Sequence, residues 1–206
     1  MKLAPLISAV LALVASACST DSFDSSAKGD SYESSVKQAD EARKAGDLNQ
    51  AIPLYSRALQ SNPNGIEAKL GLGQSYLSMG AGDEAAAQFR DVLARRSSDA
   101  VARRGLASAL ISMGQADLAA QQLEAALKSD PDDYRALNVM GVVLDIQGHH
   151  TEAQARYRRA IELAPDFAAV RNNLGLSLAI VGQAKEAIAQ LAPLASGSRA
   201  DGRVRQ

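Results

Sequence analysis

Residues 134–167 read YRALNVMGVVLDIQGHHTEAQARYRRAIELAPDF, and the features of this stretch recur through most of the chain at a spacing of 34 residues. Glycines and alanines each keep this period: Gly46, Gly80, Gly114, Gly148 and Gly182, and Ala51, Ala85, Ala119, Ala153 and Ala187. Bulky residues and prolines keep it too: Tyr55, Phe89, Leu123, Tyr157 and Leu191, and Pro63, Pro131 and Pro165, with Ser97 in the remaining proline position. A fixed period of this length indicates a repeat architecture.

The residue types in these columns predict two helices in each copy. The glycine is expected to end the first helix in the left-handed conformation, which glycine adopts at little cost. Small residues such as Gly73 and Ala85 allow the two helices to approach closely, and the bulky residue fills the gap to the next hairpin. A residue before proline avoids the helical region, so Asn62 and Asp130 are expected to end the second helix.

The period and spacing resemble the tetratricopeptide repeat (TPR), in which each copy forms two antiparallel helices. Lys69-x2-Leu72-Gly73-x2-Tyr76 matches the first half of its pattern and Ala153-x3-Tyr157 matches the second half, whereas the tryptophan of the pattern is absent. The resemblance implies an all-α fold, a right-handed α-solenoid of about five TPR helix hairpins. Such a stack curves and presents an extended concave face.

The phase of the repeat predicts the element boundaries. Helix pairs are expected at about residues 32–62, 66–96, 100–130, 134–164 and 168–196, within repeats 32–65, 66–99, 100–133, 134–167 and 168–199. Asp47 and Asp83 are the expected N-caps of two second helices. Pro193 is expected to end or kink the last helix, before a loop at residues 197–198. Residues 200–206 repeat the phase of a helix start, so we expect a sixth repeat that is truncated.

The first 17 residues have the features of a secretory signal peptide. Lys2 supplies the positive charge, residues 6–14 are apolar, and Ala15-Ser16-Ala17 provides the small residues that a signal peptidase requires. The apolar run is shorter than the roughly 20 residues that a membrane-spanning helix needs. Residues 1–17 are therefore predicted to be a signal peptide.

Residues 14–18 (VASAC) resemble a bacterial lipobox, in which the cysteine is lipidated and becomes the new N-terminus. Lipidation is therefore predicted at Cys18; the alternative is simple cleavage before it, which leaves a soluble protein. Residues 18–31 would comprise the lipidated cysteine and a flexible tether that carries too little apolar surface to fold. In such lipoproteins a residue other than Asp after the cysteine, here Ser19, favours the outer membrane. The predicted location is the bacterial outer membrane, lipid-anchored and facing the periplasm.

The composition argues against nucleic acid, disulfides and cofactors. There are 22 Lys and Arg residues against 23 Asp and Glu residues, a net charge of −1, so the basic footprint of a nucleic-acid-binding protein is missing. The single cysteine cannot form an internal disulfide or a cysteine-based zinc site. His149 and His150 are adjacent in a predicted turn without further ligands at a metal-binding spacing, so we expect no metal and no cofactor.

No enzyme signature is present: G-x-S-x-G, H-E-x-x-H and the Walker loop are all missing, and no catalytic residue is predicted. Asp132 and Asp133 follow Pro131 and are expected to complement the positive end of the next helix rather than to act as acid and base. The arginine clusters are expected to be solvated faces, the alternative being contacts with an acidic partner or lipid headgroups; they are Arg95, Arg96, Arg103, Arg104, Arg156, Arg158 and Arg159.

The inward face of each first helix carries the ligand contacts in repeats of the TPR type. Here that face mixes aliphatic residues with asparagine, glutamine and arginine, which suits an amphipathic or apolar peptide segment. The alternative is that some of the aliphatic residues only pack between neighbouring helices. The predicted groove residues are Leu70, Gln74, Leu77, Arg104, Ile111, Arg135, Asn138, Val142, Ile146, Asn172, Leu176 and Ile180, with Glu67, Val101 and Ser108 on the same face.

Residues 172–179 (NNLGLSLA), 187–195 (AIAQLAPLA) and 203–206 (RVRQ) resemble the TadD family of tight-adherence (Flp) pilus assembly. The resemblance implies a non-enzymatic assembly factor that helps the outer-membrane secretin of the pilus to fold or localise. The expected partners are this secretin or another pilus-assembly component. The alternative is a periplasmic TPR adaptor that docks and regulates peptidoglycan hydrolases or proteases.

Replacement of the proposed lipidated residue tests the predicted anchor. Cys18→Ala is expected to move the protein from the outer membrane to the soluble periplasm, or to leave its signal peptide uncleaved, because the acylated thiol is lost. Membrane fractionation and the mass of the mature protein measure both effects. Unchanged fractionation and an unchanged mass would show that Cys18 is not lipidated.

Overall fold

The computed structural model describes the backbone of residues 25–203 and the side chains of residues 32–193. The predicted signal peptide and Cys18 lie outside the described residues, as do residues 204–206. Every regular element within residues 25–203 is an α-helix. The helices follow one another as α1 (Ser25–Lys44), α2 (Leu48–Ser61), α3 (Ile66–Ser78), α4 (Gly82–Arg95), α5 (Ala100–Ser112), α6 (Ala116–Ser129), α7 (Tyr134–Ile146), α8 (His150–Leu163), α9 (Ala168–Ile180) and α10 (Ala184–Arg203).

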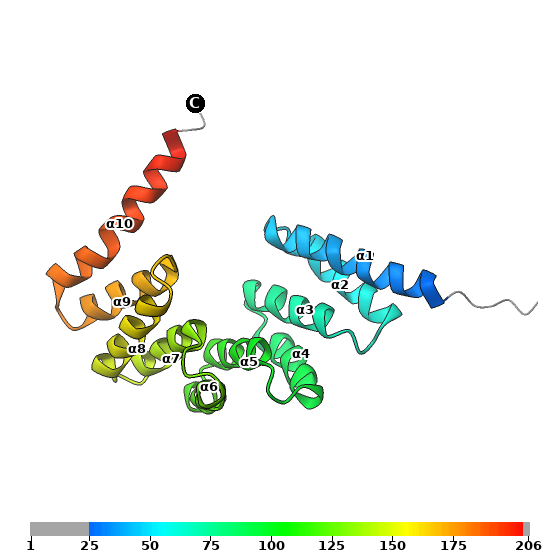
Figure 1. Ribbon diagram of the computed structural model, residues 1–206, viewed down its shortest axis with the longest axis horizontal. Coiled ribbons are helices and arrows are strands. Elements are labelled where there is room, and N and C mark those ends of the chain that lie inside the picture. The colour runs from blue at the N-terminus through cyan, green and yellow to red at the C-terminus, as the bar shows by residue number, and fades with distance from the viewer. Residues whose placement is uncertain (1–24, 204–206) are drawn as a thin grey trace, which may run out of the picture.

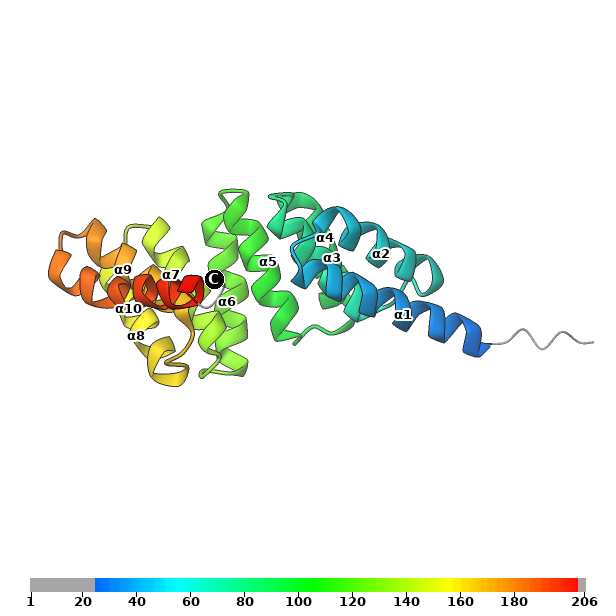
Figure 2. The ribbon, with the colours of Figure 1, turned by 90° about the horizontal axis from the view of Figure 1, so that it is seen from above.

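The helices form five consecutive hairpins that stack into an arc (Figure 1). Seen from above, the hairpins succeed one another along the long axis of the molecule (Figure 2). Each odd-numbered helix contacts the next odd-numbered helix, whereas the even-numbered helices have no such contacts within the described part of the chain. The odd-numbered helices therefore lie on the inner side of the arc. The predicted all-α solenoid of five helix hairpins is confirmed.

The periodic glycine ends each odd-numbered helix as predicted. In all five copies it has a positive φ, for example 81° at Gly46 and 76° at Gly80. The amide after the glycine donates to a carbonyl five residues earlier, as in the bond of 2.9 Å from Ala81 to Tyr76. This pattern is the Schellman motif, which satisfies the carbonyl groups left free at a helix C-terminus. The shared geometry of this turn gives each hairpin the same shape.

The bulky residues of α2, α4, α6 and α8 are buried between hairpins, as predicted, whereas Leu191 of α10 packs against Gly175 of its own hairpin. Tyr55, Phe89 and Leu123 are fully buried. The ring of Phe89 lies between two glycines, Gly73 of its own hairpin and Gly105 of the next hairpin. A Cβ atom at Gly73 would lie 2.8 Å from Cζ of Phe89, which is closer than real Cβ atoms come to a ring. The ring of Phe89 therefore requires glycine at both facing positions, Gly73 and Gly105.

Helix capping agrees with the sequence at one predicted position and not at the other. The Asp47 side chain accepts a hydrogen bond from the Gln50 amide at the start of α2, as predicted. The prediction for Asp83 is wrong, because α4 begins at Gly82 and Asp83 lies inside its first turn. A carboxylate there still complements the positive helix end. Asp133 caps α7, as expected for its helix N-terminus, whereas the Asp132 side chain forms an ion pair with Arg159.

The two ends of the array differ from expectation. Helix α1 begins at Ser25, so residues 25–31 are helical where the sequence indicated a flexible tether. Helix α10 continues through Pro193 to Arg203, so the predicted helix end and the predicted loop at residues 197–198 are wrong. The alternative, a kink at Pro193, stays a prediction. A proline removes one intrahelical hydrogen bond, and that loss is local. Helix α2 likewise continues through Pro53.

The contact between ring and glycine predicts how the cost of replacing Gly141 depends on the residue at position 157. A Cβ atom at Gly141 would overlap the Tyr157 ring, so Gly141→Ala is expected to lower the free energy of unfolding by about 1–3 kcal/mol. Ala107 and Leu123 occupy the equivalent positions one repeat earlier, and both are fully buried. In a Tyr157→Leu background the same substitution should therefore cost less than about 1 kcal/mol.

The two costs are measured by urea denaturation as a double-mutant cycle. Equal costs of Gly141→Ala in the two backgrounds would show that the ring does not set the requirement for glycine.

Candidate binding groove

Within residues 32–193, three hollows line the inner side of the arc. The middle hollow has a volume of about 530 Å³ and lies on α3, α5 and α7; its lining residues are Gln74, Leu77, Val101, Arg104, Gly105, Ser108, Arg135, Asn138, Val139 and Phe167. The aliphatic hollow has a volume of about 270 Å³ and lies between α7 and α9; it is lined by Val142, Asp145, Ile146, Tyr157, Asn173, Leu176, Ser177 and Ile180. The N-terminal hollow has a volume of about 600 Å³ and is lined by Tyr32, Glu33, Val36, Lys37, Asp40, Glu41, Lys44 and Glu67.

Most of the predicted groove residues line one of these hollows. The middle hollow contains Gln74, Leu77, Arg104, Arg135 and Asn138, and the aliphatic hollow contains Val142, Ile146, Leu176 and Ile180. Three predicted residues lie outside: Leu70 and Ile111 pack against the core, and Asn172 is exposed on α9. For Leu70 and Ile111 the alternative of packing between helices therefore describes the observed contacts.

Phe167, Asn173 and the N-terminal hollow were not predicted from the sequence. Phe167 precedes α9 at the position where Asp99 and Asp133 cap α5 and α7. Its side chain provides no cap, and it lines the middle hollow instead. A departure from an otherwise capping column is the signal that would have revealed this residue.

An arginine and two aromatic rings form a cluster beside the middle hollow. The rings of Tyr134 and Phe167 meet edge to face, with centroids 5.3 Å apart. The guanidinium carbon of Arg135 lies 4.5 Å from the Tyr134 centroid and 6.0 Å from that of Phe167. Cation–π contacts of this kind orient a guanidinium group without neutralising it. Arg135 is exposed and forms no ion pair with any residue of 32–193.

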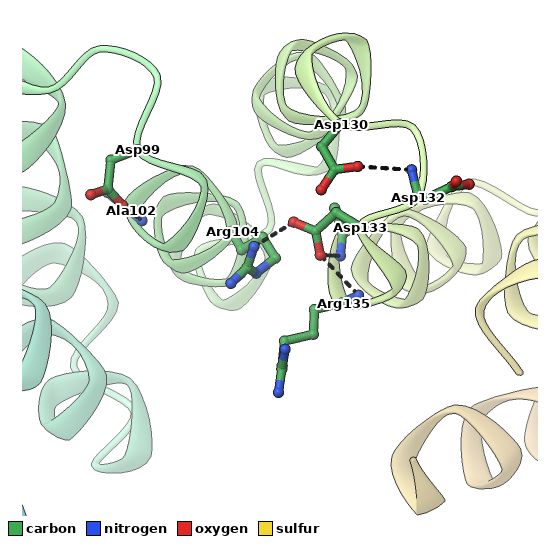
Figure 3. A network of polar contacts seen from close by, with 8 residues as sticks. Asp99, Ala102, Arg104, Asp130, Asp132, Asp133 and Arg135 are labelled. Atoms are coloured by element: carbon green, nitrogen blue, oxygen red, sulfur yellow. Dashed lines mark hydrogen bonds and ion pairs between the residues drawn. The ribbon is translucent and has the colours of Figure 1, made fainter. Parts of the chain in front are cut away.

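Arg104 differs from Arg135 because its side chain makes a contact between two neighbouring hairpins. Its guanidinium forms an ion pair with Asp133, whose other oxygen accepts hydrogen bonds from the Arg135 and Ala136 amides. Figure 3 shows Arg104 pointing toward Asp133, while the Arg135 side chain extends away from this network. Arg104 thus ties α5 to the start of α7, and Arg135 is the cation that remains available in the groove.

Asp145 lines the aliphatic hollow, and its carboxylate connects its own helix α7 to α8 and α9. Its carboxylate accepts hydrogen bonds from Tyr157 on α8 at 3.0 Å and from Ser177 on α9 at 2.7 Å. Nδ1 of His150, at the start of α8, lies 2.9 Å from the same carboxylate. Asp145 thereby holds together α7 and α9, the helices that carry Val142 and Leu176.

Several arginines of the predicted clusters form contacts within the protein. Arg103 donates to the backbone oxygen of Ser97 at 2.7 Å, and Arg171, two repeats later, donates to the equivalent oxygen of Pro165 at 3.3 Å. Both side chains therefore fasten an inter-repeat loop. On α8, the exposed Arg158 and Arg159 form ion pairs with acidic residues: Arg158 pairs with Glu186, and Arg159 pairs with Asp132 and Glu162.

Two further features of the described residues bear on chemistry. No group of three His, Cys, Asp or Glu side chains within residues 32–193 is arranged to hold a metal ion. Among the helices that the structure describes, none combines the length and the apolar character needed to cross a membrane.

Two family models match the chain, and both describe the tetratricopeptide repeat. One matches residues 42–95 and 76–141, and the other matches residues 146–198. A search of curated protein sequences finds no match.

Solved structures share the fold over most of the chain. A thermophilic TPR protein of Thermus thermophilus, TTC0263, is 23% identical with a TM-score of 0.77, over 84% of this chain and 96% of that chain. MamA protein is 24% identical with a TM-score of 0.60, over 86% of this chain and 97% of that chain. YrrB, described as a TPR protein with an unusual peptide-binding site, is 23% identical with a TM-score of 0.53, over 77% and 81%.

The buried phenols predict a loss of stability in alkali. Burial and the hydrogen bond to Asp40 raise the pKa of Tyr55 to about 12, and burial and the Asp145 charge raise the pKa of Tyr157 above its usual value of 10. The unfolded chain releases these protons near pH 10, earlier than the folded protein, so the free energy of unfolding should fall as pH rises above about 10.

Tyr55→Phe and Tyr157→Phe should each make this decline shallower, because each removes one phenol whose ionisation favours the unfolded state. Denaturation curves collected between about pH 8 and 12 give the slope for each protein. Slopes identical to that of the unaltered chain would show that Tyr55 and Tyr157 do not cause the loss of stability in alkali.

Proposed function

Because the chain belongs to the tetratricopeptide-repeat family, we propose that it is a non-enzymatic scaffold that holds a segment of a partner protein in its inner groove. TPR domains in general bind protein partners and are not enzymes. Hydrophobic side chains in a concave site with a few fixed polar groups are the usual means of holding such a segment. The three hollows provide this combination on one side of the arc.

One observation carries the proposal: large aliphatic side chains stand exposed inside the aliphatic hollow. Ile146 is 56% exposed, Leu176 is 51% exposed and Ile180 is 65% exposed. Contiguous exposed apolar side chains, rimmed by polar groups, are typical of an interaction site. Asn138 and Asn173, joined by a hydrogen bond of 2.9 Å between their amide groups, lie at the border with the middle hollow and add polar groups to this rim.

The more specific part of the proposal concerns address and partner. The lipobox-like residues ending at Cys18 support lipidation and anchoring at the bacterial outer membrane, facing the periplasm. The TadD-like segments at residues 172–179 and 187–195 support a role in Flp pilus biogenesis as a secretin-assembly lipoprotein. The partner is then an outer-membrane secretin or another component of pilus assembly.

A pull-down of the full chain from membranes of its own host, with bound proteins identified by mass spectrometry, tests this function. The variant Ile146→Ser/Ile180→Ser should lose the partner and keep its fold, because Ser78 and Ser112 occupy the equivalent positions in α3 and α5. Ile188→Ser is the matched control, since Ile188 on α10 is also 65% exposed and lies outside the hollow.

Recovery of a secretin or pilus components by the unaltered chain and by Ile188→Ser, and not by the double variant, is the expected result. Recovery of peptidoglycan hydrolases or proteases without a secretin would replace the pilus role with that of a hydrolase adaptor. Equal recovery of partners by all three proteins would show that the aliphatic hollow does not hold the partner.

A further inference from the structure

The inner positions of the array change character from one end to the other. One column holds Asp40, Gln74, Ser108, Val142 and Leu176, in helices α1, α3, α5, α7 and α9. A second column, four residues later in each helix, holds Lys44, Ser78, Ser112, Ile146 and Ile180. Both columns are charged in the first helix, polar in the next two and aliphatic in the last two.

The fold itself does not require aliphatic residues at these positions. Ser78 and Ser112 are exposed on the inner face, as Ile146 and Ile180 are. The stack therefore accommodates serine at this column, and isoleucine on α7 and α9 leaves apolar surface in water, which is unfavourable without an occupant. The aliphatic end of the groove is thus explained by what binds there and not by helix packing.

The charge of the groove also changes sign along the array. A third column holds Glu33, Glu67, Val101 and Arg135, in that order from α1 to α7. The N-terminal hollow contains four carboxylates and two lysines, whereas the middle hollow contains Arg104 and Arg135 and no acidic residue. An acidic group of a ligand is therefore repelled at the α1 end and attracted at α7.

Arg135 is the group that would receive this acid. Arg104 is occupied by Asp133, while the Arg135 guanidinium is held over the Tyr134 and Phe167 rings and exposed to the groove. Phe167 stands at a position where an aspartate, as in α5 and α7, would stabilise the start of the helix as its N-cap. The aromatic side chain at this position forgoes that stabilisation and orients the arginine instead.

We propose that the groove selects a protein segment in which one carboxylate lies about three residues from a short aliphatic stretch. The carboxylate binds Arg135, and the aliphatic side chains fill the hollow of Val142, Ile146, Leu176 and Ile180. Arg135 and Val142 are two helical turns apart, roughly 10 Å along α7, which corresponds to about three residues of an extended chain. The inference rests on the proposed function, because it describes the segment that the scaffold holds.

The test uses four synthetic peptides and the full chain in detergent. One peptide has an Asp separated by two serines from Leu-Ile-Leu; another has Lys in place of Asp; and the remaining two are the same sequences in reverse order. Titration calorimetry first identifies which of the two orders binds more tightly. In that order the Asp peptide should bind at least about fivefold more tightly than the Lys peptide, as expected for an ion pair on a partly exposed surface.

Charge reversal separates a direct contact from a structural effect. Arg135→Glu should reverse the preference in favour of the Lys peptide, whereas Arg158→Glu, the same change on the outer helix α8, should leave it unaltered. Ile146→Ser/Ile180→Ser should lower the affinity for the Asp peptide and for the Lys peptide by the same factor. Circular dichroism confirms that each variant keeps its helices.

Equal affinity for the Asp and Lys peptides, or no binding of any peptide, would overturn the inference. Neither result affects the pull-down, whose outcome decides the proposed function separately. A dimer that Ile146→Ser/Ile180→Ser abolishes would assign the hollow to a second copy of the chain. If the Cys18→Ala protein binds phospholipid vesicles, and adding Ile146→Ser/Ile180→Ser to it abolishes that binding, the aliphatic hollow would be assigned to a lipid surface. Either assignment would also overturn the inference.

Discussion

The solenoid depends on contacts in which a large side chain of an outer helix is buried between the inner helices of two adjacent hairpins. Phe89 between Gly73 and Gly105 shows their geometry, since neither glycine position has room for a Cβ atom beside the ring. The ring touches its own hairpin and the next, so one contact fixes both the closure of a hairpin and its distance to its neighbour. Each repeat then needs only its neighbours, as in other quasi-one-dimensional folds.

The sequence predicted what such local rules determine. The left-handed turn at Gly46, the helix stop at Asn62 and the burial of Tyr55 each follow from a residue type at a fixed phase. The ends of the array were predicted less well, because no second neighbour constrains them. Pro193 is the clearest example: its local cost predicted a helix end, and α10 nevertheless continues to Arg203.

The groove was predicted in outline because its positions follow from helical periodicity, and its chemistry was not. Leu70 and Leu176 looked equivalent in the sequence as aliphatic residues on an inner face. In the structure Leu70 packs against the core, and Leu176 stands half exposed. Likewise Arg104 and Arg135 both looked like groove cations in the sequence, and they differ in the structure because Arg104 pairs with Asp133 while Arg135 lies over two aromatic rings. Such distinctions depend on contacts between repeats, which a column of residue types does not contain.

The array therefore divides its residues between two tasks. Positions that face a neighbouring hairpin must keep their size, as Gly73 and Phe89 do, so they carry little information about a partner. Positions on the inner face tolerate serine, isoleucine, acid or arginine without altering the stack, as Ser112 and Ile146 show at the same column. On the proposed binding mode, an inner face that runs from acidic through basic to aliphatic matches a ligand with a fixed order of groups. The specificity of the molecule then resides in the sequence of its repeats along the arc, and the period of 34 residues supplies only the frame.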